Sequence, residues 1–189
     1  MTESPNPHIV DADSLTGEMH PIRRGVIAIG SNLGERRDHL QGAVSSLADT
    51  PEVWVTSISP VYETAPVDSP EGVRNYLNAV VLFDTTLSAR TLLERALAVE
   101  AAYGRERDGT PNAPRTLDVD LIVLGDRRAD EPDLVLPHPR AAERAFVLAP
   151  WLDVEPDAAI PGVGDVSDLL EKTGREGITL RDDIELELG

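Results

Sequence analysis

The 189-residue chain contains no cysteine, four histidines and a single lysine, Lys172. The lack of cysteine excludes disulfides, thiolate metal sites and cysteine nucleophiles, and so few histidines are poor material for structural zinc. No apolar run approaches the roughly 18 residues that a membrane-spanning helix needs, and the N-terminus lacks the basic-then-apolar pattern of a secretory signal. The sequence therefore predicts a cytoplasmic protein.

Positive charge is also scarce, since 34 acidic residues stand against 17 basic ones and the net charge is −17. Residues 150–189 are the most acidic part, with 11 acidic and three basic side chains. Such a surface repels nucleic acid phosphates and anionic membranes, so we expect neither as a partner. The acid excess by itself can serve solubility alone, and an anionic substrate would need a local cluster of arginines.

Length and composition favour one globular domain. Residues 1–24 contain three prolines and little periodicity, which predicts a flexible N-terminal arm, and residues 25–189 are expected to form a single domain.

Hydrophobic periodicity predicts the elements of this domain. Strands are expected at 26–29, 53–62, 75–83 and 116–125, helices at 40–47, 88–103, 141–151 and 166–172, and weak strands at 134–136 and 178–188. Ser88 is a candidate N-cap and Gly104 a candidate C-terminal cap, while Pro150 limits the length of its helix. The order strand, helix, strand, strand, helix, strand indicates a ferredoxin-like core of the α+β class.

The most informative strand carries two aspartates. Because side chains alternate across a strand, Asp118 and Asp120 face one way, about 6–7 Å apart at Cα, and Leu117, Val119 and Leu121 face the other. Carboxylates at this spacing repel each other and suit Mg²⁺, which prefers oxygen ligands, waters and substrate phosphates. The alternative interpretation is a solvated edge strand whose aspartates point outward.

Three arginines precede or adjoin this strand: Arg105, Arg107 and Arg115. Each alone is an ordinary surface residue, but guanidinium groups beside a divalent-cation site suit a polyphosphate. No convincing general base stands out in the sequence.

Five motifs occur in order along the chain: Gly30-Ser31-Asn32-Leu33-Gly34, Tyr62-Glu63-Thr64-Ala65-Pro66, Tyr76-Leu77-Asn78-Ala79, Pro114-Arg115-Thr116-Leu117-Asp118-Val119-Asp120 and Leu136-Pro137-His138-Pro139-Arg140. Together they resemble the 6-hydroxymethyl-7,8-dihydropterin pyrophosphokinase family of the folate pathway, over residues 26–151 and more weakly beyond. The resemblance implies a three-layer α/β sandwich with a mostly antiparallel sheet. It also implies transfer of pyrophosphate from ATP to the pterin hydroxymethyl group, with release of AMP.

The resemblance further implies roles for single residues. Two Mg²⁺ ions would be held by Asp118 and Asp120, and Arg105, Arg107 and Arg115 would serve catalysis at the phosphates. The pterin contacts would be Thr64, Ala65, Val67, Tyr76, Asn78 and Phe146, and the ATP contacts Arg105, Arg107, Leu121, His138 and Arg144. We expect a monomer whose partners are ATP and the pterin.

The residues themselves leave simpler interpretations open. Tyr76 can be a cross-strand packing residue, Phe146 a core residue and His138 a surface histidine. Asn78 is less easily explained in this way, because asparagine is otherwise unfavourable in a strand. Glu100 can order Arg105 or a ligand, or can be a half-exposed helix residue.

The glycine motif and one loop limit the resemblance. The segment 30–34 lacks the Lys-Ser/Thr ending of a phosphate-binding loop, so we interpret it as a structural turn. Pro111 and Asn112 stand where the family often carries Arg and Trp, which puts one phosphate or pterin contact in doubt, and Ala65 and Val67 are milder changes.

Two rival functions remain at this stage. A palm-like nucleotidyltransferase also combines a ferredoxin-like sheet with an Asp-x-Asp strand, but it would attack the α-phosphorus and release pyrophosphate. A non-catalytic pterin-binding or nucleotide-binding module is favoured only if Pro111 has disabled the site.

Overall fold

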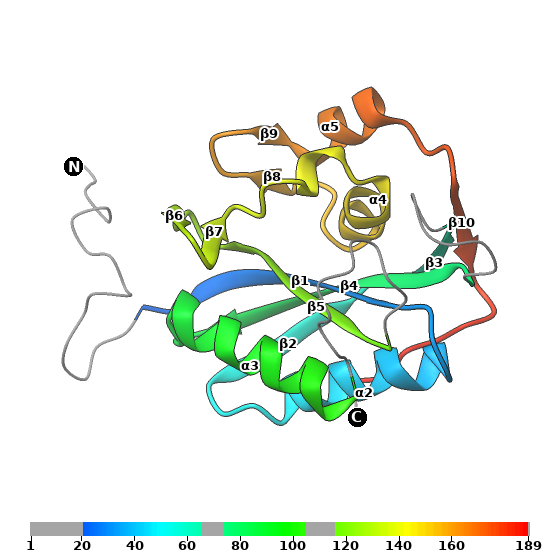
Figure 1. The fold of residues 1–189 in the computed structure, drawn as a ribbon. Helices are drawn as coiled ribbons and strands as arrows, with labels where there is room; N and C mark the ends of the chain where they lie inside the picture. The colour runs from blue at the N-terminus through cyan, green and yellow to red at the C-terminus, as the bar shows by residue number, and fades with distance from the viewer. Residues whose placement is uncertain (1–20, 66–73, 105–115, 189) are drawn as a thin grey trace.

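The structure is a computed structural model that describes residues 21–65, 74–104 and 116–188 (Figure 1). Its strands are β1 (Arg23–Ser31), β2 (Val53–Ile58), β3 (Val61–Thr64), β4 (Tyr76–Thr85), β5 (Asp118–Leu124), β6 (Ala129–Glu131), β7 (Leu134–Leu136), β8 (Ala159–Ile160), β9 (Gly164–Asp165) and β10 (Ile178–Arg181). Its helices are α2 (Arg36–Ala48), α3 (Ala89–Ala102), α4 (Ala145–Val154), α5 (Val166–Thr173) and the 3₁₀ turn η2 (Ala141–Glu143).

One six-stranded sheet organises the chain. The strands follow the order β10-β3-β4-β1-β5, with β2 also paired to β4, and every pairing within the described residues is antiparallel. The chain runs through β1, α2, β2 and β3, β4, α3 and β5, which is the strand and helix order predicted from periodicity. The α+β class and the mostly antiparallel sheet are therefore confirmed.

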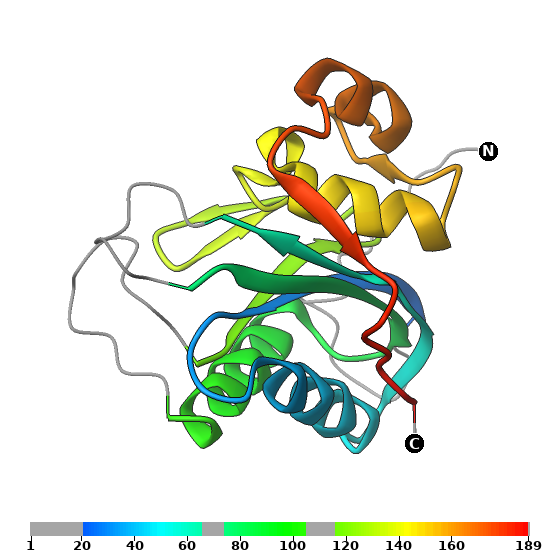
Figure 2. The same cartoon turned by 90° about the vertical axis from the view of Figure 1, so that its right-hand side faces the viewer.

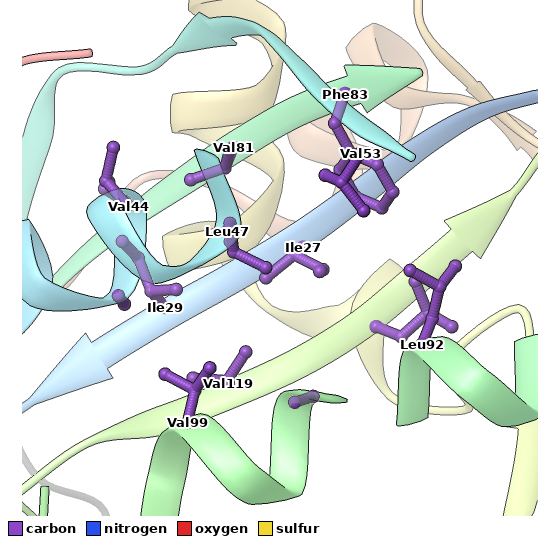
Figure 3. Packing of buried hydrophobic residues seen from close by; sticks show 14 of the residues in the cluster. Ile27, Ile29, Val44, Leu47, Val53, Val81, Phe83, Leu92, Val99 and Val119 are labelled. Carbon is purple, nitrogen blue, oxygen red and sulfur yellow. The ribbon is translucent and has the colours of Figure 1, made fainter. Parts of the chain in front are cut away.

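Helices cover both faces of the sheet and make three layers, as Figure 1 shows, with α2 and α3 on one face and α4 and α5 on the other. The alternation along β4 builds both cores at once. Leu77, Val81 and Phe83 face α2 and α3, whereas Val80 and Leu82 face α4. Figure 3 shows the first of these cores, where α2 and α3 press aliphatic side chains onto the sheet. Each such side chain contributes about 1.5–3 kcal/mol when fully buried.

The segment 53–62, expected as one strand, is two strands separated by Ser59 and Pro60. Pro60 has no N–H to donate to the ladder. The Ser59 hydroxyl accepts a hydrogen bond from the Val80 N–H at 2.7 Å, and the Ser59 N–H donates to the Val80 carbonyl at 2.9 Å. A side-chain oxygen thus replaces a backbone acceptor at the break, which periodicity alone does not reveal.

Helix α4 extends beyond its predicted end. Pro150 lies inside the helix, which runs to Val154 rather than ending at Trp151, and its expected first residues form the separate turn η2. Leu148 and Trp151 are fully buried, and the Trp151 Nε1–H donates to Glu155 Oε1 at 2.9 Å. Packing therefore outweighs the backbone hydrogen bond that proline removes.

The two ends of the described chain also differ from expectation. Strand β1 begins at Arg23, paired with Thr85, inside the segment 1–24 for which the sequence predicts an arm. Residues 1–20 of that segment lie outside the described residues. Strand β10 covers Ile178–Arg181 only, instead of 178–188. The following residues leave the edge of β3 and approach α2, where Glu187 N donates to Gln41 Oε1 and Gln41 Nε2 donates to the Glu187 carbonyl, both at 2.8 Å.

Among the helices in the described part of the chain, none combines the length and apolar character needed to cross a membrane.

Candidate active site

Candidate pterin and metal residues meet in a row that crosses the sheet. Asn78 of β4 is the register partner of Gly30 in β1, and Gly30 is the partner of Asp118 in β5. Two residues along the strands, Ala28 is the partner of Asp120. Directly opposed residues of antiparallel strands direct their side chains to the same face. Asn78 and both aspartates therefore share the face that α4 partly covers, and the backbones of Asn78 and Asp118 are about 10 Å apart, two strand spacings.

Gly30 provides clearance in the middle of this row. A Cβ atom on it would lie 2.9 Å from Asn78 Oδ1 and 3.7 Å from Tyr76 Cδ1. The interpretation of residues 30–34 as a turn is therefore wrong for Gly30, which lies within β1; the turn follows Ser31 and includes Gly34 at φ +67°. Sequence reasoning missed this role because it depends on which residues of β4 and β5 are aligned with Gly30.

The two aspartates lie as the strand alternation predicted. Leu117 and Val119 are buried in the core beneath α2 and α3, while Asp118 and Asp120 are half-buried on the opposite face. Strand β5 is indeed an edge strand of the main sheet, but its aspartates are not simply solvated.

Glu100 of α3 completes the outer edge of β5. This side chain is buried, and its Oε2 accepts the Val119 N–H at 2.8 Å, between the two aspartates in sequence. The half-exposed interpretation of Glu100 is therefore wrong. The carboxylate satisfies a backbone donor that an edge strand would otherwise leave unpaired, and it anchors to α3 the strand segment that carries Asp118 and Asp120.

The pterin candidates cluster at the start of β4 and the end of β3. Asn78 Nδ2 donates a 2.9 Å hydrogen bond to Thr64 Oγ1, and both side chains are buried. Tyr76 is half-buried on the same face as Asn78, and Ala65 is exposed directly after β3. Phe146, at the start of α4, packs against the core on this side of the sheet. The structure therefore brings Thr64, Tyr76, Asn78 and Phe146 to one side of the sheet, with Ala65 next to Thr64, whereas Val67 lies outside the described residues.

His138, a nucleotide candidate, is held next to β5. Its backbone N–H donates to the Ile122 carbonyl of β5 at 2.8 Å, and its ring Nδ1 accepts the backbone N–H of Arg140 at 3.2 Å. Burial, followed by the positive charges of Arg144 and Arg140, lowers the pKa of His138 to about 4. The ring is therefore neutral at pH 7 and carries its proton on Nε2, where it can donate to a ligand.

The remaining nucleotide candidates separate into two groups. Arg144 precedes α4, and its guanidinium carbon lies 5.5 Å from the centroid of the Phe146 ring, a cation–π contact that links a nucleotide candidate to a pterin candidate. Leu121 does not join them, because its side chain is buried in the core on the opposite face from the aspartates.

Several candidates lie outside the described residues, namely Arg105, Arg107 and Arg115. The same holds for Pro111 and Asn112, the two positions that differ from the family pattern. Within the residues that are described, no cluster of three or more acidic or histidine side chains suits a metal ion. Asp118 and Asp120 thus offer carboxylate oxygens for a cation whose other ligands would be waters and phosphate oxygens. This donor set fits Mg²⁺, which keeps several waters and binds through one or two carboxylates.

Comparison with known proteins points to one family. A family model described as 7,8-dihydro-6-hydroxymethylpterin-pyrophosphokinase (HPPK) matches residues 26–156. A Pseudomonas aeruginosa protein named 2-amino-4-hydroxy-6-hydroxymethyldihydropteridine pyrophosphokinase is 37% identical over 157 residues, covering 83% of this chain and 96% of the relative. A Mycobacterium leprae protein of the same name is 41% identical over 176 residues, covering 84% and 89%.

Solved structures support the fold independently. Two crystal structures of Plasmodium falciparum HPPK-DHPS match with TM-scores of 0.67 and 0.66 at 11% and 13% identity, and they cover 87% and 86% of this chain. The chain spans about half the length of those proteins, 47% and 49%. The family match and the relatives that align over most of their length together show that the chain belongs to the HPPK family.

Proposed function

We propose that this protein transfers pyrophosphate from ATP to the hydroxymethyl oxygen of 6-hydroxymethyl-7,8-dihydropterin and releases AMP, a step of folate biosynthesis. The observation that carries the proposal is the row across the sheet, in which the Asn78–Thr64 pair and the Asp118–Asp120 pair share one face with Gly30 between them. A ligand lying over Gly30 can touch an amide at one end and reach a carboxylate-bound phosphate at the other.

Recognition of the pterin follows from the shape of its ring. A flat heterocycle needs aromatic faces and a few fixed polar groups along its edge. Tyr76 and Phe146 supply the aromatic faces. Because Asn78 uses Nδ2 to bind Thr64, its Oδ1 lies next to Gly30 as an acceptor for an N–H on the pterin edge. Thr64 thus acts by orienting the amide of Asn78.

The reaction exchanges one phosphorus–oxygen bond for another. The hydroxymethyl oxygen bonds to the β-phosphorus of ATP, the bond from that phosphorus to the α–β bridging oxygen breaks, AMP leaves with that oxygen, and the hydroxyl proton passes to solvent. Asp118 and Asp120 would hold Mg²⁺, which supplies positive charge to the phosphate oxygens. We propose two ions. Arg105, Arg107 and Arg115 would add guanidinium donors, and neutral His138 would donate from Nε2 to the nucleotide.

The wider setting is also a proposal. The lack of cysteine means that the fold needs no disulfide, which suits a reducing cytoplasm. The strongly negative net charge disfavours nucleic acid and anionic membranes as partners. We propose a cytoplasmic monomer with a single pyrophosphokinase domain that includes β1 from Arg23 onward.

Product identification tests the proposal directly. Incubation with ATP, Mg²⁺ and 6-hydroxymethyl-7,8-dihydropterin is expected to yield AMP and the pterin diphosphate, resolved by anion-exchange chromatography and mass spectrometry. Release of pyrophosphate with a nucleotidylated pterin would instead indicate attack at the α-phosphorus. Binding of both substrates without turnover would indicate a non-catalytic module.

The aspartate pair can be tested by an isosteric change. Asp120→Asn removes one charged oxygen donor and is expected to lower kcat by at least about 100-fold, because even groups that merely orient metal ligands contribute 10–100-fold. Asp130→Asn, at an exposed position of β6, is the control and should retain wild-type kcat. Near-normal turnover in the Asp120 variant across a Mg²⁺ titration would remove Asp120 from the metal site.

Two glycines of β1 should respond differently to the same change. Gly30→Ala places a methyl group against Asn78 Oδ1, so the KM for pterin is expected to rise about 10-fold, or about 1.4 kcal/mol, with little change in the KM for ATP. Gly25→Ala, whose Cβ would meet the Phe83 ring at 2.3 Å, should instead lower the free energy of unfolding by about 1–3 kcal/mol. An unchanged pterin KM in the Gly30 variant would contradict the proposed clearance.

The low pKa of His138 predicts a stability change in mild acid. As pH falls below about 6.5, the unfolded chain takes up a proton on His138 that the folded protein does not accept until about pH 4. The free energy of unfolding should therefore decrease over this window by up to about 1.4 kcal/mol per pH unit from this group. Urea titrations at several pH values should show a smaller decrease for His138→Gln, and parallel curves for both proteins would contradict the assignment.

A further inference from the structure

Behind the pterin face, a carboxylate is held between two guanidinium groups. Glu63 Oε2 lies 3.3 Å from Arg36 Nη1 at the start of α2, and Glu63 Oε1 lies 2.5 Å from Arg181 Nη1 at the end of β10. Because side chains alternate along β3, Glu63 faces the α2 side while Thr64 and Tyr62 face the α4 side. The three charged residues therefore lie on the opposite side of the sheet from the proposed pterin contacts. We call Arg36, Glu63 and Arg181 the clamp.

Arg36 joins the two strand ends that carry pterin contacts. Besides binding Glu63, its Nη1 donates to the carbonyl of Asn75 at 2.8 Å. Glu63 directly precedes Thr64, and Asn75 directly precedes Tyr76. One guanidinium thus contacts the side chain of the residue before Thr64 and the backbone carbonyl of the residue before Tyr76, and Thr64 and Tyr76 are themselves register partners.

The C-terminal segment supplies the other half of the clamp. Strand β10 pairs with β3, with Arg181 opposite Val61, and Figure 2 shows the chain passing from there down the sheet edge toward α2. Asp183 Oδ2 lies 2.8 Å from Arg181 Nη2 and orients its guanidinium. The two hydrogen bonds between Gln41 and Glu187 then anchor the rest of the segment to α2.

These contacts differ from ordinary surface ion pairs, which contribute little. Both oxygens of Glu63 are engaged, and the side chains of Arg36, Glu63 and Arg181 are only 16%, 22% and 29% exposed. Burial alone would raise the pKa of Glu63, but the hydrogen bonds from Arg181 and Arg36 outweigh it and hold that pKa below its ordinary value. A cation in the first turn of a helix is also unfavourable to the helix dipole, so the position of Arg36 suits its external partners better than α2 itself.

We propose that the clamp positions the pterin-binding strand ends, with Glu63 as a positioning residue that acts through the backbone of β3 and β4 on Thr64, Asn78 and Tyr76. The inference rests on the proposed function for the identity of the ligand. It adds that the C-terminal segment, through Arg181, contributes to pterin affinity although none of the clamp side chains faces the pterin.

Substrate-specific kinetics test the clamp. Glu63→Gln keeps the size of the side chain but removes its charge, and it is expected to raise the pterin KM about 10-fold while the ATP KM stays within about twofold. Arg181→Gln should act in the same direction, and Arg181→Lys should recover part of the loss. A titration with 6-hydroxymethyl-7,8-dihydropterin alone, followed by its fluorescence, should show the same order of affinities without turnover.

A matched control is available on the far side of the molecule. Arg90 of α3 also joins two acidic side chains, with Glu131 Oε1 at 2.5 Å and Asp133 Oδ2 at 2.7 Å. Arg90→Gln removes an ion-pair network of similar composition but is expected to leave both KM values unchanged.

Two results would overturn the proposal. Either a lower melting temperature with both KM values unchanged, or an equal rise in both, would show that the clamp serves general stability. If Glu63→Gln fails to fold, the comparison of Arg181→Gln with Arg181→Lys decides between the same outcomes. Absence of AMP formation by the unsubstituted protein would refute the proposed function, whereas the pterin titration would still report on the clamp.

Discussion

The alignment of β3, β4, β1 and β5 across the sheet is the constraint on which the candidate site depends. Antiparallel pairing places Asn78, Gly30 and Asp118 in one row, and a shift of any strand by one residue would turn its side chains to the opposite face. The hydrophobic alternation of β4, which fills a core on each side, resists such a shift. The same packing that stabilises the fold therefore holds the Asn78 amide and the Asp118–Asp120 carboxylate pair at a set separation.

The two faces of the sheet carry different kinds of residues. On the α2 and α3 face, aliphatic packing, the Glu100 contact to β5 and the Arg36–Glu63–Arg181 clamp hold the strands from behind. The α4 face carries the half-buried side chains of Tyr76, Asp118 and Asp120. Neighbouring residues of a strand share one backbone although their side chains point to opposite faces. A contact that fixes the backbone on the α2 and α3 face therefore also fixes the positions of the side chains on the α4 face.

Much of the local structure could be predicted from the sequence. The predicted helix at 88–103 corresponds to α3, with Ser88 as the N-cap that accepts the Thr91 N–H, and the opposite facing of Asp118 and Val119 follows from strand periodicity alone. The points at which strands and helices end were less predictable. The interruption at Ser59 depends on a bond to Val80, and the continuation of α4 through Pro150 depends on burial against other elements. Both involve partners distant in sequence.

The sequence by itself determined the chemistry that is present: paired carboxylates on one strand face, an asparagine and a tyrosine two residues apart on another, and no cysteine. These properties follow from side-chain identity and from the period of a strand, which are local. Only the tertiary structure decided that Gly30 lies between the asparagine and the carboxylates and that Leu121 faces away from them. It also decided that Glu63 forms ion pairs with Arg36 of α2 and Arg181 of β10. Strand register and helix docking set these relations, because they are fixed by packing between segments that lie far apart along the chain.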